Sequence, residues 1–397
     1  MTGAATRLRV VEVRTRSEQA EFIRLAWRLN RGRPLWVPPL LTDERRYVVP
    51  GRGAAPRCET VAALAFRDGE AVGRILGLVQ HRHNELTGAR TARFARLECV
   101  DDVEVARGLL GFVESWGAGR GMDRVVGPME GSDQEPEGFL IDGFQFDPTI
   151  ATYYNPEYIP SLLEGCGYGK EVDYVVYRID VPGELPEFYR RILARSEARG
   201  SFRLKEFRRR GELRGYIEPI FKLMGSAYEG IYGFVPPTPE EQRALARQYL
   251  PLLDPRFVKV AEKDGEVVGF IVGMPNLARG LRRANGRLLP IGFLHVLREM
   301  RRSRQLDLLL GGVRADCRGR GVDVLVGAAM LREAHRGGFR LMDSHHELET
   351  NLPMRAEMEK FGAVIYKRYR IYGKALPAGG AGAPAPRPAA ALSAGDG

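Results

Sequence analysis

The feature that most constrains the fold of this chain is an internal repeat. The segment DGEAVGRI at residues 68–75 returns as DGEVVGFI at residues 264–271, which is 196 residues later. In both copies Asp-Gly separates two apolar, strand-like runs, and this pattern predicts a tight hairpin whose turn needs positive φ angles. Asn155 returns as Asn351 at the same interval, and behind each lies a short helical segment, a glycine and a strand. The sequence therefore predicts two copies of one α/β plan.

The length of the chain suits this division. Its 397 residues exceed one typical domain of about 150 residues. We predict an N-terminal domain at residues 1–182, a C-terminal domain at residues 183–375 and a tail at residues 376–397. The tail is rich in Ala, Gly and Pro, a composition typical of disorder.

Composition narrows the class of protein. Cys58, Cys99, Cys166 and Cys317 are scattered, without a CxxC pair or neighbouring histidines, which indicates reduced thiols in the cytoplasm and no metal site. An uninterrupted apolar run of about 18 residues is missing from the sequence, so we expect no stable insertion into a membrane. The net charge of +10 suits coenzyme phosphates, nucleic acid or a membrane surface, but a GC-rich genome also produces an arginine-rich chain. Charge alone therefore selects no partner.

The motif with the most specific chemistry lies at residues 313–322, where an apolar, strand-like run gives way to an amphipathic helix. It contains Arg318, Gly319, Arg320 and Gly321. A glycine-containing turn at a helix start directs unpaired N–H groups outward, and together with the helix dipole these groups bind anions, so a diphosphate is the natural ligand. The spacing fits neither a Walker loop nor a dinucleotide fingerprint. A chance match in a chain rich in Arg and Gly, or an RNA-binding Arg-Gly segment, is the alternative.

In this context the chain resembles the GNAT superfamily of acyl-CoA N-acyltransferases, whose coenzyme loop reads Arg/Gln-x-x-Gly-x-Gly/Ala. Arg318 and Gly321 match the loop, and Asn351 follows Arg318 by 33 residues, as a helix-opening Asn does in that family. The resemblance implies an α/β fold of two tandem mixed-sheet domains, of which the first is a degenerate copy. It also implies that an acyl-CoA, which we expect to be acetyl-CoA, lies between splayed strands at residues 307–315 and 340–348. The residues expected to bind its pantetheine and diphosphate are Val313, Arg318, Gly319, Arg320, Gly321 and Asn351.

The chain departs from the family pattern in three places. Asp323 occupies the last position of the loop, where Gly or Ala is expected, and places a carboxylate near the phosphates. Met358 stands where the family often has a tyrosine that acts as general acid, and a thioether cannot protonate a thiolate. In the first copy, Asp101, Asp102 and Glu104 stand where the phosphate turn would be, and their charges would repel a diphosphate. We predict that the first copy has lost coenzyme binding and serves as structure or as a wall of the acceptor site.

Acyl transfer to an amine needs a base that accepts the ammonium proton. The predicted strand at residues 340–348 offers candidates, because a period of two places Asp343, His345 and Glu347 on one face. We predict Glu347 or His345 as the catalytic base; alternatively, these side chains only form hydrogen bonds with neighbouring loops. His346 would point to the opposite face as a hydrogen-bonded core histidine.

Two further segments have ambiguous patterns. The first copy carries about twenty extra residues before its asparagine, and Asp133, Glu135 and Glu137 among them either attract a cationic amine or belong to a solvated loop. Near residues 286–303, leucines and arginines are interleaved as in a basic amphipathic helix. Such a helix could contact a membrane or nucleic acid, or pack on the fold with a cationic outer face.

The resemblance predicts transfer of an acyl group, which we expect to be acetyl, from acyl-CoA to the amine of a small molecule or peptide. The amine would attack the thioester directly, without a covalent enzyme intermediate and without a metal. One alternative is a tRNA-dependent aminoacyltransferase with tandem GNAT-like halves, which would not need the diphosphate turn. Another is a non-catalytic module that binds acyl-CoA. We expect a cytoplasmic protein that does not bind nucleic acid.

Overall fold

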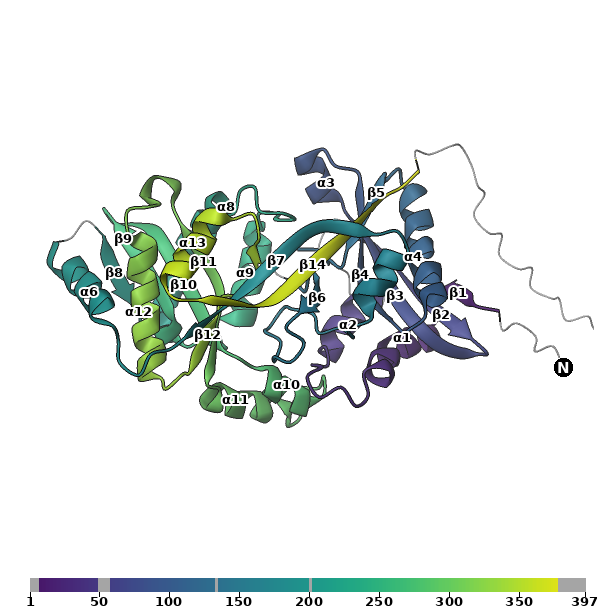
Figure 1. The fold of residues 1–397 in the computed structure, drawn as a ribbon, viewed down its shortest axis with the longest axis horizontal. Helices are drawn as coiled ribbons and strands as arrows, with labels where there is room; N and C mark the ends of the chain where they lie inside the picture. Colours follow the sequence, from purple (N-terminus) through teal and green to yellow (C-terminus); the bar gives the residue numbers. More distant parts are fainter. Residues whose placement is uncertain (1–6, 49–57, 133–134, 200–201, 378–397) are drawn as a thin grey trace, which may run out of the picture.

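The structure is a computed structural model that describes residues 7–48, 58–132, 135–199 and 202–377. Two predictions fall outside these residues, namely the role of Asp133 and the disorder of the tail beyond residue 377. The described chain forms an elongated α/β body in which one long sheet carries helices on its faces (Figure 1).

A mixed sheet of 14 strands runs through the whole molecule. Its strands are β1 (Arg9–Glu12), β2 (Cys58–Arg67), β3 (Glu70–Gln80), β4 (Thr91–Cys99), β5 (Arg124–Gly127), β6 (Phe139–Asp142), β7 (Gly169–Asp180), β8 (Arg203–Glu206), β9 (Val258–Lys263), β10 (Glu266–Pro275), β11 (Gln305–Val313), β12 (Leu341–Asp343), β13 (Glu347–Leu348) and β14 (Val364–Ala375). Across the sheet the order is β1-β2-β3-β4-β5-β14-β7-β12-β11-β10-β9-β8, while β6 pairs with β14 and β13 pairs with β7.

Helices pack on both faces of this sheet. They are α1 (Arg16–Leu29), α2 (Leu41–Val48), α3 (His81–Thr87), α4 (Val103–Ala118), α5 (Ile159–Gly165), α6 (Glu187–Arg199), α7 (Arg210–Leu213), α8 (Ile217–Ala227), α9 (Pro239–Tyr249), α10 (Ala278–Ala284), α11 (Gly292–Arg302), α12 (Val322–Arg336) and α13 (Leu352–Lys360). In the first half, α1 and α2 cover one face, and α4 and α5 cover the other. In the second half, α6 and α12 lie opposite α8.

The structure confirms the predicted repeat of local elements. Both Asp-Gly pairs form the turns of hairpins, β2–β3 and β9–β10, and all four residues have positive φ: 53° and 80° at Asp68 and Gly69, and 53° and 81° at Asp264 and Gly265. Such angles define the tight turn that suits the twist of a hairpin. In each half a parallel strand pair then follows, β4 with β5 and β11 with β12.

The last strand of each half lies in the other half. β7 pairs with β12 on one side and β14 on the other, while β14 pairs with β5 and β7. Neither final strand therefore pairs with the parallel core strand of its own half. The two long strands cross the middle of the molecule side by side (Figure 1). A division of the chain at residue 182 stays a prediction, but strand pairing joins the two halves from both directions.

Because β14 completes the sheet of the first half, removal of a buried side chain from β14 should destabilise the first half, although its residues are distant in sequence. We expect Tyr369→Ala, which removes a ring buried in the cluster around Val126, to lower the free energy of unfolding by about 3–5 kcal/mol. Trp27, Trp36 and Trp116 all belong to the first half, so tryptophan fluorescence during urea denaturation measures unfolding there.

The matched control is Val364→Ala, since Val364 lies on the same strand but is 57% exposed. It should change the free energy of unfolding by no more than about 0.5 kcal/mol. An unchanged tryptophan transition in Tyr369→Ala would contradict the stabilisation of the first half by β14.

Candidate functional site

The strands expected to enclose a coenzyme diverge. β11 and β12 pair in parallel from Gln305 to Asp307 and from Leu341 to Asp343, after which β11 continues along β10 to Val313. β11 also carries a bulge, because Leu308 and Leu310 face consecutive residues of β10 and Leu309 between them faces none. A bulge re-aims the side chain and bends the strand. Leu309 packs into an apolar cluster with Leu281 of α10 and Val296 of α11, among others.

The turn after β11 has the shape expected of an anion-binding segment. Gly319 and Gly321 have φ angles of 68° and 85°, a conformation that favours glycine. A Cβ atom at either position would meet no other atom within 4 Å, so the outer side of the turn is open. α12 begins at Val322, as predicted, and its first N–H groups have no intrahelical acceptor.

The two arginines of the turn already contact protein atoms. The Nε and Nη2 atoms of Arg318 each donate to a backbone carbonyl, that of Val313 and that of Ala227, at 3.3 Å. The guanidinium of Arg320 lies 5.7 Å from the ring centre of Phe202. Both bonds of Arg318 are long for hydrogen bonds between nitrogen and oxygen. They hold the side chain beside the turn.

Asn351 opens α13, which is the position that the sequence predicted. Its Oδ1 accepts from the N–H of Met354 at 3.4 Å and so caps the helix. A contact with pantetheine stays a prediction. In the first half, Asn155 has a different task, because its buried amide donates to and accepts from the backbone of Leu140 on β6. Asp102 caps α4 at the position that corresponds to the glycine turn before α12 in the second half.

The predicted row of three polar side chains on one strand is wrong. The strand expected at residues 340–348 is interrupted, and β12 and β13 flank three residues that are not in a strand. Asp343 lies opposite Arg178 of β7, and Glu347 lies opposite Val175. Three residues between the paired positions on one side therefore face two on the other, and this extra residue reverses the alternation of side chains. Asp343 and Glu347 consequently point to opposite faces of the sheet.

Glu347 is half-buried, and its carboxylate has no hydrogen-bond or ion-pair partner within the described ranges. Burial raises the pKa of Glu347 to about 8. A carboxyl group with a pKa near neutral pH can accept a proton in one step and release it in the next. The environment of Glu347 is therefore suited to a general base.

His345 occupies the interruption itself, with a φ of 62° that is uncommon for a residue other than glycine. Its backbone N–H donates to Asp343 at 2.7 Å, and its Nε2 lies 2.9 Å from the carbonyl oxygen of Ile150. Because a carbonyl can only accept, Nε2 carries the proton and Nδ1 retains a lone pair. Burial lowers the pKa of His345, which favours this neutral form.

His346 is a core histidine, but the prediction that it is hydrogen-bonded is wrong. Its ring lies against those of Tyr174 and Tyr369, with centres 5.0 and 4.4 Å away. Its buried Nε2 has no hydrogen-bond partner in the part of the chain that the structure describes. Burial lowers the pKa of His346 well below its usual range, so the ring stays neutral in the stack.

A buried polar cluster lies where β11 and β12 meet, and sequence reasoning missed most of it. Asp307 and Asp343 are register partners across the parallel pair, and Lys367 of β14 forms an ion pair with Asp343 at 2.9 Å. Burial, followed by the charge of Asp343, raises the pKa of Asp307 well above its usual range and favours its protonated form. Burial is the largest influence on Lys367 and acts to lower its pKa, but the charge and hydrogen bond of Asp343, together with Tyr369 and Asp307, outweigh it and the pKa is raised. The signal in the sequence that could have identified this cluster was a charged residue within a strand segment, as at Asp307 in β11 and Lys367 in β14.

This cluster anchors a loop of the first half. Lys367 Nζ donates to the carbonyl of Asp147 at 3.3 Å, and Asn276 Nδ2 donates to that of Pro148 at 3.0 Å. The bond from His345 to Ile150 is the third in this series. The anchored loop at residues 147–150 lies at the end of the extra segment that the first copy carries before Asn155. Its three carbonyl groups accept from the second half, so the end of the extra segment connects the two halves.

The other side of this loop lines a cavity of about 960 Å³, which is near the upper end of the volumes of small-molecule pockets. Its walls come from both halves: from residues 36–47, 74–82, 96–98, 130–132, 135–136 and 148–154 of the first, and from residues 235–252 and 277–297 of the second. One end is apolar and includes Ile150, Leu252, Leu277, Leu281 and Val296, which belong to the cluster around the β11 bulge.

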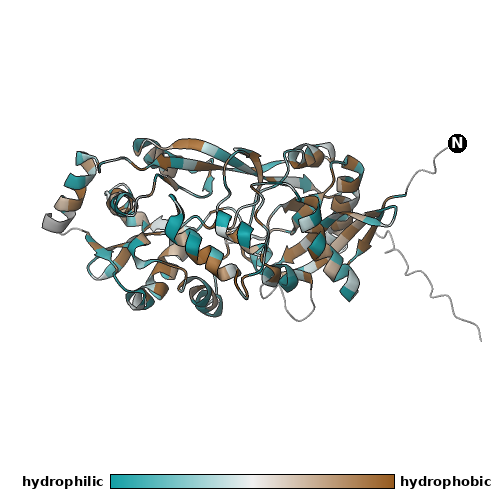
Figure 2. Ribbon diagram, turned by 90° about the horizontal axis from the view of Figure 1, so that it is seen from below, coloured by the Kyte–Doolittle hydropathy of each residue, from teal (hydrophilic) through white to brown (hydrophobic). Residues whose placement is uncertain are grey.

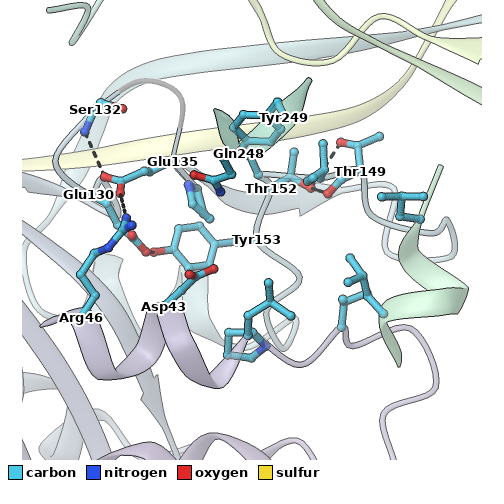
Figure 3. A pocket seen from close by; sticks show the side chains of 18 of the residues that line it. Asp43, Arg46, Glu130, Ser132, Glu135, Thr149, Thr152, Tyr153, Gln248 and Tyr249 are labelled. Carbon is cyan, nitrogen blue, oxygen red and sulfur yellow. Dashed lines mark hydrogen bonds and ion pairs between the residues drawn. The ribbon is translucent and has the colours of Figure 1, made fainter. Parts of the chain in front are cut away.

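The other end of the cavity is polar (Figure 3). Glu130 forms an ion pair with Arg96 at 3.1 Å and accepts from the hydroxyl of Tyr153 at 3.2 Å. Tyr47 donates to Glu135 at 2.7 Å. Burial raises the pKa of Glu130, although Arg96 opposes this shift. The cavity is therefore amphipathic along its length.

The acidic segment of the first copy contributes to this polar end. Glu135 lines the cavity and also accepts from the backbone N–H groups of Gly131 and Ser132, so it is part of an ordered turn. Glu137 is buried and bridges Met129 and Thr152 through its backbone. Its attraction for an amine stays a prediction. Among the described residues, no group of three or more His, Cys, Asp or Glu side chains could hold a metal ion.

Comparison with known proteins identifies relatives of nearly full length. The chain is 30% identical over 380 residues to the bacterial ceramide synthase of Caulobacter vibrioides, covering 93% of this chain and 98% of that protein. It is 28% identical over 353 residues to protein YghO of Escherichia coli K12, covering 86% and 89%. No protein-family model matches the chain.

Solved structures confirm the fold that the sequence predicted. A tandem GNAT protein of the clavulanic acid biosynthesis pathway matches with a TM-score of 0.55 at 14% identity, covering 94% of this chain and 99% of that one. A GCN5-related N-acetyltransferase from Sphaerobacter thermophilus matches with a TM-score of 0.50 at 15% identity, covering 93% and 96%. At such identities the likeness concerns the fold alone. The nearly full-length relationship to the Caulobacter protein shows that the chain belongs to the family of the bacterial ceramide synthase. The solved structures show that this chain has the tandem fold of GNAT acyl-CoA N-acyltransferases.

Proposed function

We propose that this protein is an N-acyltransferase that joins the acyl group of an acyl-CoA to the amine of a long-chain acceptor. The observation that carries the proposal is the amphipathic cavity, whose apolar end packs on the bulge of β11. The coenzyme thioester is expected beside this strand, so a hydrocarbon chain could extend from it into the cavity. A ceramide is an amide of a long-chain amino alcohol, and the name of the Caulobacter relative supports an acceptor of this class.

The reaction would form a C–N bond and break a C–S bond. The amine attacks the thioester carbonyl, the ammonium proton passes to a base, and the departing thiolate takes up a proton to give free coenzyme. Glu347 and the neutral His345 are the two candidate bases: His345 lies within the strand interruption, and Glu347 is the first residue of the strand that follows it. An acetyl group would fill little of the cavity, so its volume favours a longer chain in at least one of the two substrates.

The turn at residues 318–321 is the proposed seat of the coenzyme diphosphate. We expect Arg318→Ala to weaken binding of CoA, measured by calorimetry, about tenfold, which corresponds to about 1.4 kcal/mol. Arg336→Ala is the control, because Arg336 lies at the other end of α12 and pairs with Glu333. Equal affinity of wild type and Arg318→Ala would refute the assignment of this turn.

The pH dependence of kcat/KM distinguishes the two bases. A base works when deprotonated, so a reaction that depends on Glu347 should accelerate as pH rises through about 8. Dependence on His345 should instead place the rise below the usual histidine pKa of about 6.5, because burial lowers the pKa of His345. Glu347→Gln should then reduce kcat at least about 100-fold and abolish the rise near pH 8.

Two variants serve as comparisons. His345→Asn keeps a residue type that tolerates positive φ and removes the base. Its shorter side chain also gives up the bond from Nε2 to Ile150. Glu349→Gln alters a carboxylate two residues away that pairs with Lys170, and it should leave the profile unchanged. If Glu347→Gln and His345→Asn both keep wild-type activity, neither residue is the base. If the wild-type protein binds acyl-CoA but forms no amide, the alternative of a non-catalytic module is favoured.

Occupation of the cavity by a hydrocarbon chain predicts a change in chain-length preference. Leu281→Trp would add volume at the apolar end, beside Leu309. We expect kcat/KM for long-chain substrates to fall about tenfold or more, while that for short-chain substrates changes little. Leu86→Trp on α3 is the control, because Leu86 is exposed and does not line the cavity. An unaltered preference in Leu281→Trp would remove the cavity from the proposal.

A further inference from the structure

The segment formed by α10, α11 and the connection between them exposes an unusual number of large apolar side chains. Six of them follow one another within ten residues: Leu288 (36% exposed), Leu289 (78%), Ile291 (62%), Phe293 (41%), Leu294 (52%) and Leu297 (45%). Single exposed apolar residues are normal on a soluble protein, but a contiguous patch of this kind marks an interaction site. We refer to these six residues as the apolar patch.

Positive charge surrounds the apolar patch. Residues 278–304 contain eight arginines and a single acidic residue, Glu299, which is buried. Arg287, Arg298, Arg301 and Arg302 are exposed, and within the described residues none of the four forms an ion pair. By contrast, Arg279 and Arg282 of α10 pair with Asp147. The unpaired charges therefore flank the apolar side chains at the surface.

The apolar patch is also the rim of the cavity. Leu288, Phe293 and Leu297 are partly exposed to solvent and at the same time line the cavity. Leu289 and Ile291 are the most exposed members and do not line it. Seen from the side that carries α10 and α11, hydrophobic and hydrophilic positions alternate closely along the helices (Figure 2). An apolar path thus leads from the molecular surface into the interior.

We propose that α11 and the connection before it dock the protein on an anionic lipid bilayer, with the apolar patch inserted among the headgroups and the arginines bound to lipid phosphates. A helix with apolar residues on one side and arginines beside them lies in the plane of the interface. Charge complementarity selects this partner, because a bilayer surface offers both a hydrocarbon region and negative charge. None of the described helices is long and apolar enough to cross a membrane, so the contact is peripheral.

Docking in this orientation would open the cavity toward the bilayer. A long-chain molecule could then move from the membrane into the cavity past Leu288, Phe293 and Leu297 without entering water. The transfer of a substrate from the membrane into the cavity rests on the proposed function, but the docking itself does not. Vesicle binding is measured without acyl-CoA or amine, so its failure and the failure of the proposed reaction are distinguishable.

The test is sedimentation of the full-length protein with vesicles of phosphatidylcholine containing about 30% phosphatidylglycerol, compared with vesicles of phosphatidylcholine alone. We expect binding to the anionic vesicles that decreases as salt screens the charges. The double variant Leu289→Glu/Ile291→Glu should reduce the partition coefficient at least about tenfold, since both side chains would have to enter the headgroup region. Arg298→Glu/Arg301→Glu should reduce it on anionic vesicles.

Matched controls separate docking from a general change in surface character. Leu86→Glu replaces a leucine on α3 that is as exposed as Ile291, and Arg208→Glu/Arg214→Glu removes two exposed arginines that flank α7. Both controls should bind vesicles like the wild type, and circular dichroism should show all variants folded.

Three results would overturn the proposal. The first is the absence of binding to anionic vesicles, and the second is equal binding by the Leu289→Glu/Ile291→Glu variant and the wild type. The third is a wild-type protein that self-associates in sedimentation velocity, does not bind vesicles and becomes monomeric in the same variant. In that case the apolar patch joins two copies of this chain.

Discussion

The exchange of β7 and β14 between the halves is the constraint on which the rest of the structure depends. Each of these strands has backbone hydrogen-bond partners on both edges, and both neighbouring strands belong to the other half. A strand removed from this position would leave two rows of buried backbone groups without partners, which is costly. The halves therefore cannot shift relative to each other without breaking the sheet. A cavity with walls from both halves keeps its shape for the same reason.

The buried cluster of Asp307, Asp343 and Lys367 has a related role. Charges removed from water are costly unless they are paired and hydrogen-bonded. Here a raised pKa favours neutral Asp307, which leaves Lys367 and Asp343 as a matched pair. Lys367 and the neighbouring Asn276 and His345 donate to carbonyl groups of the loop at residues 147–150. Polar atoms that would otherwise destabilise the interior are thus used to fix one wall of the cavity.

Local features of this fold could be predicted from the sequence because they depend on local chemistry. Asp-Gly at residues 68–69 and 264–265 set the two hairpins, and the glycine turn set the start of α12 at Val322. The helix start at Asn351 was equally accessible, since an Asn that precedes a helix caps it.

Features that depend on distant contacts were not accessible in this way. The exchange of β7 and β14 leaves no local signal, because a final strand reads the same whichever half it joins. One extra residue between Asp343 and Glu347 reversed a face that strict alternation had predicted. The cavity is built from many separate segments of both halves, and most of them read alone as a loop or a surface helix.

Both copies have a β-bulge in the equivalent strand, and the bulged residues differ in chemistry between the two copies. β4 carries a bulge like that of β11, since Arg74 and Leu76 of β3 pair with Glu98 and Ala95, so that two residues of β4 oppose one of β3. In the second half the bulge directs Leu309 into the apolar cluster. In the first half it holds Arg96, with a φ of 52°, among the carboxylates at the polar end.

Equivalent positions of a repeated fold thus serve the two ends of one cavity. The chemistry of the turns agrees with this asymmetry. Asp102 caps α4 and pairs with Arg67, so a carboxylate occupies the place where a second diphosphate would have to bind. Like charges at such short distance repel each other, which favours one coenzyme per chain. If the first half binds no coenzyme, as we predict, it is free to supply polar walls to a site whose proposed coenzyme-binding turn lies in the second half.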